Sequence, residues 1–450
     1  MIGNGDIRVS FYTLGCKLNQ AETELLAGQF NEAGYHLVSP NDMADIYIVN
    51  TCTVTHIADR KSRHWLRLAR RRKPEALIIA TGCYAQRAPQ ELAQIADLVI
   101  SNEGKEHLLE VVKRMRSQSN VVVSEAKQPH SEGKIKQFSI PYNTRVRSLI
   151  KIQNGCHSPC TYCIVPRVRA YEYSSPASQI IEEIKRKVAI GYKEVVLTGT
   201  KVGCYSHNGI DLRGLIERIL HNTDIKRLRL SSLQPREISA ELLALWQDAA
   251  LSDSEGSRLC HHFHLALQSG SDVILRRMKR CYSLNDYQKT INLIREVIPD
   301  VAITTDVMVG FPGETEGEFE QSYRFCQQAG FANIHVFPFS PRPGTAAAKI
   351  PQRVRDQQKR ERAQRMLELA RYCRHSFYAQ FLGRTISVLW EKETNFGSGI
   401  YSGLTDNYIR VFTQSEKPLT NRVTPVKLDG FYNQGMWGKL VSEDSSQGKD

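Results

Sequence analysis

Residues 148–163 read SLIKIQNGCHSPCTYC, a short β-rich run followed at once by Cys156, Cys160 and Cys163. A cubane iron–sulfur cluster usually takes four thiolates, but this loop offers three, and the next cysteine is Cys204. One iron would then lack a protein ligand, and an open coordination position is what a catalytic metal centre needs. We therefore predict an iron–sulfur enzyme centred on this loop. Zinc is the alternative, but zinc sites favour paired C-x-x-C elements, and this sequence holds one such pair.

The strand before the loop is the first of six similar units. Each unit joins a β-rich run to a helical stretch, and the runs are SLIKIQ, EVVLTG, RLRLSSL, HFHLALQ, VAITTDVMVG and NIHVFPFS. Consecutive βα units form right-handed crossovers and a parallel sheet. Six of them predict a partial (βα)6, TIM-like barrel with its active site at the carboxyl ends of the strands.

A second set of cysteines occupies similar positions near the N-terminus. The runs IRVSFYTLGC, ADIYIVNTC and ALIIATGC end in Cys16, Cys52 and Cys83, and helical stretches follow. Because parallel strands end at the same edge of a sheet, the three thiols can meet there. The alternative is three separate buried cysteines, since free cysteine is commonly buried. We favour convergence, which again leaves one iron without a protein ligand.

The predicted fold class is α/β, with a small all-β barrel at the end of the chain. Residues 353–381 lack proline and glycine and favour a basic helix, and short β-rich runs separated by turn residues follow. The predicted parts are an N-terminal parallel α/β domain (1–127), a linker (128–145), the partial barrel (146–350), the basic helix (351–382), the five-stranded β-barrel (383–442) and a disordered tail (443–450).

Composition places the chain among ordinary globular proteins. It has 450 residues, of which 41% are hydrophobic and 24% charged. No apolar run approaches the roughly 18 residues of a membrane span, and the first residues lack the pattern of a signal peptide. We therefore expect a cytoplasmic protein, in which clustered cysteines indicate metal binding or catalysis rather than disulfides.

The net charge of +13 is concentrated in two stretches, residues 55–73 and 351–384. Such basic stretches indicate a polyanionic partner, nucleic acid before membrane. Three- and four-residue spacing predicts one basic stripe on each helix, and Tyr408 with Arg410 in the β-barrel could stack on bases or form its core. The predicted RNA-binding residues are Arg60, Arg63, Arg67, Arg70, Lys359, Arg362, Tyr408 and Arg410.

The cysteine loop at the start of a six-unit βα domain resembles the radical S-adenosylmethionine superfamily. That resemblance implies a 4Fe–4S cluster that reductively cleaves S-adenosylmethionine. The cofactor-binding residues that it implies are Tyr162, Thr198, Gly199, Gln268, Ser269, Asp306, Gly310 and Glu314. Without the resemblance, the glycines would be ordinary turn residues and Asp306 a helix cap.

Across residues 8–442 the chain resembles the methylthiotransferase family, and within it the threonylcarbamoyladenosine tRNA branch. The resemblance rests on TLGCKLNQ (13–20), NTCTVT (50–55), HLALQSGS (264–271), HVFPFSP (335–341) and, in a region similar to the RNA-binding TRAM domain, TDNYIR (405–410). It implies two 4Fe–4S clusters, S-adenosylmethionine as methyl donor and radical source, and methylthiolation of the adenine C2 beside the anticodon. The implied partners are the tRNA anticodon stem-loop, an electron donor protein and an unknown sulfur donor. No side-chain acid, base or nucleophile is proposed.

Two alternatives remain open. The first is a methylthiotransferase acting on isopentenyl-adenosine in tRNA or on a ribosomal-protein aspartate. The second is a non-catalytic iron–sulfur protein that binds RNA or carries electrons, although an electron carrier gains nothing from an open iron. The sequence departs from the family after Pro166, where Ala170 and Glu172 stand, and after Gly199, where Thr200 and Lys201 stand.

Overall fold

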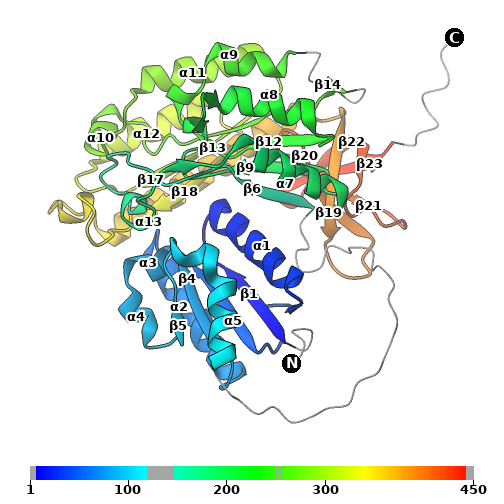
Figure 1. Cartoon of the computed structure of the whole chain (residues 1–450). Coiled ribbons are helices and arrows are strands. Elements are labelled where there is room, and N and C mark those ends of the chain that lie inside the picture. The colour runs from blue at the N-terminus through cyan, green and yellow to red at the C-terminus, as the bar shows by residue number, and fades with distance from the viewer. Residues whose placement is uncertain (1–6, 119–145, 249–251, 254–255, 442–450) are drawn as a thin grey trace. The chain divides into compact units, whose positions relative to one another are not determined.

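The computed structural model describes residues 7–118, 146–248, 252–253 and 256–441. The predicted linker at 128–145 and the predicted tail at 443–450 lie outside these residues. The chain divides into two compact units, one of residues 1–143 with Arg167–Arg169, and one of residues 144–166 and 170–450 (Figure 1). The second unit contains the partial barrel, the basic helix and the β-barrel.

The first unit is built on a five-stranded parallel sheet in the order β2-β1-β3-β4-β5. The strands are β1 (Arg8–Thr13), β2 (His36–Val38), β3 (Ile46–Thr51), β4 (Leu77–Gly82) and β5 (Leu98–Val99). The helices are α1 (Lys17–Glu32), α2 (His56–Arg72), α3 (Cys83–Arg87), α4 (Pro89–Ala93) and α5 (Leu108–Gln118). The three predicted strands are confirmed as β1, β3 and β4, the centre of the sheet.

Side chains on β3 show why this sheet is covered on both faces. Tyr47 and Val49 pack in one core with Leu66 of α2, whereas Ile46 and Ile48 pack in another core with residues of α1 and α5. Successive strand residues point to opposite faces, so a continuous apolar run requires two apolar layers. The result is a sheet between two layers of helices, with its carboxyl edge free to carry a site.

The second unit contains the predicted partial barrel. Its strands lie in the orders β12-β9-β6 and β13-β16-β17-β18, with every pairing in these two sheets parallel. The strands are β6 (Arg147–Lys151), β9 (Glu194–Thr198), β12 (Arg227–Leu230), β13 (Ser232–Leu233), β16 (His262–Leu265), β17 (Ala302–Val309) and β18 (Asn333–Pro338). Because β12 and β13 are successive parts of one predicted strand, the six predicted units are confirmed.

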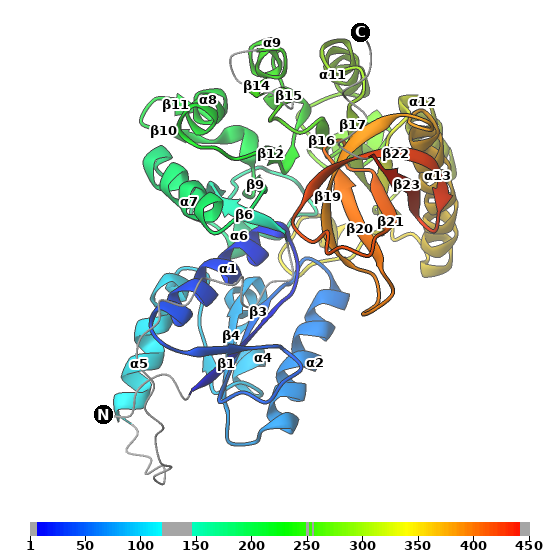
Figure 2. The same cartoon turned by 90° about the vertical axis from the view of Figure 1, so that its right-hand side faces the viewer.

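Helices surround the strands of the partial barrel on the outside (Figure 2). They are α7 (Ala177–Ala189), α8 (Leu212–Asn222), α9 (Ala240–Leu243), α10 (Asp272–Arg277), α11 (Leu284–Val297), α12 (Glu316–Ala329) and α13 (Asp356–Ala379). The short helix α6 (Val165–Val168) follows the cysteine loop in the sequence. Short antiparallel pairs decorate the loops, namely β7 (Gln153–Asn154) with β8 (Tyr173–Ser174), β10 (Ser206–His207) with β11 (Ile210–Asp211), and β14 (Ser252–Asp253) with β15 (Gly256–Ser257).

The C-terminal strands close into the predicted five-stranded barrel, in the order β19-β20-β21-β23-β22. They are β19 (Thr385–Glu393), β20 (Ile400–Thr405), β21 (Arg410–Gln414), β22 (Val423–Tyr432) and β23 (Gly435–Leu440). Trp390 is part of its core, together with Phe377 of α13 and Phe381 just after this helix. The basic helix is therefore an integral part of the packing beside this barrel. Within the described residues, no helix has the length and apolarity to cross a membrane.

Candidate functional site: two sets of three cysteines

The loop that carries Cys156, Cys160 and Cys163 is shaped by Gly155. Gly155 has φ +79°, and a Cβ atom at this position would lie 2.2 Å from the carbonyl oxygen of Tyr171. Only glycine fits such a left-handed conformation against another backbone without strain. The loop thus turns sharply at the end of β7, directly before the first cysteine.

Hydrogen bonds from several parts of the second unit hold the loop. Thr161 donates its backbone N–H to the Met278 carbonyl over 3.1 Å, and its own carbonyl accepts from the Ala347 N–H over 2.8 Å. His157 lies 3.0 Å from the carboxylate of Glu172. Glu172 is one of the departures from the family pattern, and in this chain it supports the cysteine loop.

The three thiols lie close enough to affect one another. Burial, with smaller contributions from the neighbouring Cys160 and Cys156, raises the pKa of Cys163 to about 12. Arg280 donates from Nη1 to the Cys160 sulfur over 3.3 Å, so a cation lies beside this sulfur. In the described part of the chain, no three His, Cys, Asp or Glu side chains could share one metal ion. An iron–sulfur cluster does not need three side chains around one metal ion, because each thiolate binds a separate iron.

Unpaired polar atoms at the carboxyl ends of the strands fit a bound S-adenosylmethionine. Gln268, after β16, has φ +70°, and its buried Oε1 has no hydrogen-bond partner among the described residues. The buried hydroxyl of Thr200, after β9, is likewise without one. Buried polar atoms are normally paired, so these two suit a polar ligand. Tyr162 packs beside the apolar cluster that contains Met278 and Met308.

Three of the other predicted cofactor-binding residues are Thr198, Gly199 and Asp306. Thr198 is buried at the end of β9, and a Cβ on Gly199 would lie 2.8 Å from the Gln153 carbonyl, so this turn requires a close backbone approach. Asp306 on β17 lies 3.3 Å from the His264 imidazole. These three predictions stay open.

Ser269 and Glu314 have hydrogen-bond partners within the fold, and their binding of the cofactor stays a prediction. The Ser269 hydroxyl lies 3.1 Å from the Ser322 hydroxyl of α12, where it serves packing. Glu314 accepts from the Gly310 N–H over 2.7 Å and closes its own loop. Burial raises the pKa of Glu314 to about 7, although this N–H and Arg362 lower it. Gly310 itself has φ +71°, so its role in this turn is conformational.

Sequence reasoning missed several polar residues near the loop. Arg280 also donates from Nη2 to the Gln234 side chain over 3.3 Å. The Cys204 thiol lies 3.6 Å from the carboxylate of Glu237, and the Lys201 N–H donates to Gln153 over 2.8 Å. No local motif marks Arg280 or Glu237, because only the folded barrel brings them near residues 153–163.

The second cysteine set lies at the carboxyl edge of the sheet in the first unit. Cys16 follows β1 after a short turn, whereas Cys52 and Cys83 directly follow β3 and β4, and these three strands are neighbours. Cys16 is exposed, and the other two are buried. A Cβ on Gly15 (φ +100°) would lie 2.8 Å from the Cys52 sulfur. Burial raises the pKa of Cys52 to about 12, and nearby Cys83 and Cys16 raise it as well.

Asn19 connects the three strand ends. Its Nδ2 donates to the carbonyl of Leu14 over 2.8 Å and to that of Thr51 over 3.0 Å. Its Oδ1 lies 4.0 Å from the Cys83 sulfur. One buried amide therefore contacts the segments that carry all three cysteines, which favours convergence over three unrelated buried thiols.

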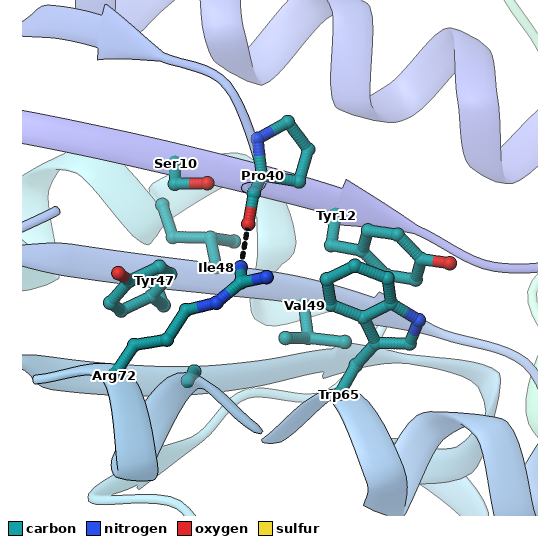
Figure 3. A pocket seen from close by; sticks show the side chains of 9 residues that line it. Ser10, Tyr12, Pro40, Tyr47, Ile48, Val49, Trp65 and Arg72 are labelled. Atoms are coloured by element: carbon teal, nitrogen blue, oxygen red, sulfur yellow. Dashed lines mark hydrogen bonds between the residues drawn. The ribbon is translucent and has the colours of Figure 1, made fainter. Parts of the chain in front are cut away.

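Helix α2 presents its basic residues on two different sides. Arg72 donates to the carbonyl of Pro40 and lies over Trp65, which stacks on Tyr12 (Figure 3). These residues line a small pocket against the middle of the sheet, and none of the three cysteines lines it. Arg63 donates to the Tyr84 hydroxyl over 2.5 Å. These contacts hold the inner side of the helix to the sheet.

Other basic residues of α2 are exposed on its outer side. Its exposed basic residues, here called the outer stripe, are Arg60, Lys61, Arg67 and Arg71. Arg70, which we predicted to bind RNA, instead pairs with Asp97 and donates to the Pro74 carbonyl over 2.7 Å. Of the four predicted residues on this helix, Arg60 and Arg67 thus lie where a polyanion could reach them.

On α13 the structure corrects the prediction of a basic stripe. Arg362 is only 4% exposed and donates to Glu314 over 2.8 Å and to Glu316 over 3.0 Å. Lys359 donates to Asp356 over 3.1 Å, and its aliphatic chain packs on Gly310. The spacing of these residues was read correctly, but they face the protein rather than solvent.

In the β-barrel, Tyr408 and Arg410 have partners within the second unit. The Tyr408 ring stacks on His262 with centroids 4.4 Å apart, and the Arg229 guanidinium lies 4.9 Å from the same ring. Arg410 pairs with Glu391. That either residue binds RNA stays a prediction, but the aromatic ring already has a packing role.

A different aromatic group, here called the barrel trio, consists of Phe412, Tyr432 and Trp437. Phe412 and Tyr432 have centroids 5.2 Å apart, and Tyr432 and Trp437 have centroids 5.0 Å apart. All three are partly exposed. Phe412 pairs with Trp437 across β21 and β23, a parallel contact between distant segments that sequence periodicity alone does not reveal.

Comparisons with known proteins agree with this geometry. Residues 8–101 match a family described as uncharacterized protein family UPF0004, and residues 150–326 match the radical SAM superfamily. The threonylcarbamoyladenosine tRNA methylthiotransferase of Bacillus subtilis is 33% identical over 98% of this chain and 98% of its own. That of Aquifex aeolicus is 38% identical over 91% of this chain and 98% of its own.

A relative named for a different activity also matches. The tRNA-2-methylthio-N(6)-dimethylallyladenosine synthase of Syntrophotalea carbinolica is 31% identical over 96% of this chain and 100% of its own. Among solved structures, the radical S-adenosylmethionine methyltransferase TsrM from Kitasatospora setae has a TM-score of 0.54 at 14% identity, covering 76% of this chain and 77% of that one. At that identity the likeness concerns the fold alone.

Proposed function

The chain belongs to the radical S-adenosylmethionine methylthiotransferase family, and from that premise we propose that it methylthiolates C2 of N6-threonylcarbamoyladenosine beside the anticodon of tRNA. The observation that carries the proposal is a set of three cysteines in each unit, at the ends of the parallel strands β1, β3 and β4 in the first unit and in the loop after β6 and β7 in the second. Two incompletely ligated clusters suit a reaction that needs both a radical and a sulfur donor.

The choice of modified adenosine rests on the relatives. The two proteins named for threonylcarbamoyladenosine are 33% and 38% identical to this chain, and the one named for dimethylallyladenosine is 31% identical. That margin favours the first substrate, and the second is the alternative that the experiment below distinguishes. Since tRNA is found in the cytosol, we place the enzyme there.

The chain offers a site for each cofactor. Cys156, Cys160 and Cys163 would hold the cluster of the radical SAM domain, and Cys16, Cys52 and Cys83 would hold a second cluster. When bound, the clusters and S-adenosylmethionine supply the radical, the methyl group and the sulfur. The protein orients them. Arg280 donates to the Cys160 sulfur, and the unpaired Gln268 Oε1 is available to the cofactor.

RNA would bind through charge and stacking. The outer stripe of α2 begins a few residues after Cys52 in the sequence and is suited to phosphate contacts. The barrel trio offers partly exposed rings on which bases can stack. An electron donor protein is required for reductive cleavage of S-adenosylmethionine, and a sulfur donor must replenish the second cluster.

Nucleoside analysis of tRNA tests the substrate. In a strain that lacks the gene, mass spectrometry should show loss of methylthio-threonylcarbamoyladenosine and retention of methylthio-isopentenyl-adenosine. Wild-type protein should restore the product, and Cys160→Ala or Cys52→Ala should not. Cys281→Ala is the matched control, because Cys281 is exposed and belongs to neither set. Loss of the isopentenyl derivative instead would favour the alternative substrate.

Cofactor analysis tests the chemistry separately. After anaerobic reconstitution, about eight irons per chain are expected from two cubane clusters. Under reduction the protein should form deoxyadenosine from S-adenosylmethionine. A protein that binds iron but forms no deoxyadenosine would instead be the non-catalytic RNA-binding or electron-transfer protein.

A further inference from the structure

A buried ion-pair network lies beneath the cysteines of the first unit. Glu22 of α1, Lys105 and Arg169 are 6%, 4% and 5% exposed. Arg169 binds Glu22 with both ends of its guanidinium, over 2.7 and 2.8 Å. Lys105 donates to the same carboxylate over 2.6 Å and to Asn50 over 3.2 Å. Burying charges is costly even when they are paired, so this network calls for a function.

Hydrogen bonds connect the network to the thiols. Arg169 donates from Nη2 to Asn19 Oδ1 over 2.8 Å, and the same oxygen lies 4.0 Å from the Cys83 sulfur. The Asn102 amide lies 3.8 Å from that sulfur on another side and donates to the Val168 carbonyl over 2.8 Å. Both amides that contact Cys83 are thus held by residues 168 and 169.

Arg169 is also electrostatically coupled to the cysteines. Burial alone would lower its pKa, but Glu22 and the nearby sulfurs of Cys83 and Cys16 raise the pKa well above its usual value. The guanidinium therefore stays charged. Two cations, Arg169 and Lys105, bind one carboxylate beside sulfurs that become negative when they ligate iron.

We propose that Arg169 and Lys105 are positioning residues that supply positive charge to a thiolate-held cluster at Cys16, Cys52 and Cys83. The inference rests on the second cluster of the proposed function. In this arrangement Glu22 fixes both cations, and Asn19 connects Arg169 to the strand ends by hydrogen bonds. Arg169 stands six residues after Cys163, so the segment that follows one cysteine set supplies a charge to the other.

The experiment isolates the second cluster. In a Cys156→Ala, Cys160→Ala, Cys163→Ala background, anaerobic reconstitution should give about four irons per chain. Arg169→Met is compared with Arg167→Met, its matched control, because Arg167 is exposed on the same segment. The midpoint potential of the cluster and its rate of iron loss to a chelator are then measured, without any turnover.

Reduction adds negative charge, so removal of a nearby buried cation makes reduction harder. Arg169→Met should shift the midpoint potential to a more negative value and speed iron loss, whereas Arg167→Met should change neither. Arg169→Lys keeps the charge and loses the two-pronged contact, so its potential should lie closer to that of the background. A merely structural role predicts equal effects of Lys and Met.

The outcomes separate the two hypotheses. If the background binds no iron, the second cluster of the proposed function fails. If it binds about four irons and Arg169→Met has the potential of Arg167→Met, the inference about Arg169 is overturned and the cluster stands. Should Arg169→Met fail to fold, Lys105→Met carries the same expectation, and an unchanged potential in that variant overturns the inference equally.

Discussion

Arg362 of α13 donates from Nη1 to Glu314 Oε2 over 2.8 Å, and both side chains are buried. Through this contact the longest helix of the second unit holds the turn after β17, where Glu314 also receives the Gly310 N–H. Arg365 extends the network by donating to Glu316 over 2.9 Å and Glu320 over 2.8 Å. Arg362 and Arg365 therefore fix this helix against α12 and the preceding loop.

Replacement of Arg362 should destabilise the second unit. Arg362→Met leaves the Glu314 carboxyl buried without its cation, and breaking one side of a buried pair typically costs about 3–5 kcal/mol. The free energy of unfolding in urea should fall by that order. Arg360→Met is the matched control, since Arg360 is exposed on the same helix, and it should change stability by less than about 0.5 kcal/mol. Equal stability of both variants would show that the pair contributes little.

The close approach of Gly155 to Tyr171 predicts the loss of one cluster. In Gly155→Ala the new methyl group would lie 2.2 Å from the Tyr171 carbonyl oxygen, so the cysteine loop cannot keep its shape. Reconstituted iron should fall from about eight to about four per chain. Gly209→Ala is the control, because Gly209 also has positive φ, at +78°, but has open space around it. Full iron content in Gly155→Ala would contradict the assigned role of this turn.

Local sequence pattern was sufficient to predict the strands that carry cysteines. The runs before Cys52 and Cys83 are apolar, β-rich and followed by helices, and they form the central strands β3 and β4. The edge strands β2 and β5 were missed because His36–Val38 and Leu98–Val99 are too short to show periodicity. Such short segments become strands because they pair with β1 and β4.

Long-range partners account for what the sequence could not predict at the site. Arg169 binds Glu22, 147 positions away, and Arg280 reaches Cys160 across 120 positions. Helical spacing predicted one basic stripe on α2, but Arg63 and Arg70 have partners within the first unit, whereas Arg60 and Arg67 are exposed. Which way an arginine faces depends on acids elsewhere, such as Asp97 for α2 and Glu316 for α13. Periodicity specifies which residues share a face, and tertiary packing decides whether that face is covered.

The outer stripe of α2 should contribute more to RNA binding than the exposed side of α13. Arg60→Gln with Arg67→Gln removes two exposed cations of the outer stripe, so the slope of log affinity for tRNA against log salt should decrease in magnitude by about 2. Filter binding over a salt series measures it. Arg360→Gln with Arg371→Gln removes the same charge from the exposed side of α13 and serves as the control. An identical loss of slope in both double variants would reduce the effect to net charge.

Aromatic residues of the β-barrel should separate into those that bind RNA and those that support the fold. Trp437 is partly exposed at the end of the barrel trio, and loss of a stacked base typically costs about 1–3 kcal/mol. Trp437→Leu should therefore weaken binding of an anticodon stem-loop by that amount and leave the unfolding transition nearly unchanged.

Tyr408→Leu provides the opposite expectation. Its ring stacks on His262 and lies beside Arg229, so the substitution should lower the free energy of unfolding by about 1–3 kcal/mol. Stem-loop affinity of the folded protein should stay near that of wild type. Fluorescence anisotropy and urea unfolding on both variants measure the two quantities. If Tyr408→Leu weakens binding while Trp437→Leu does not, the bases stack beside Tyr408 and the barrel trio is only a surface cluster.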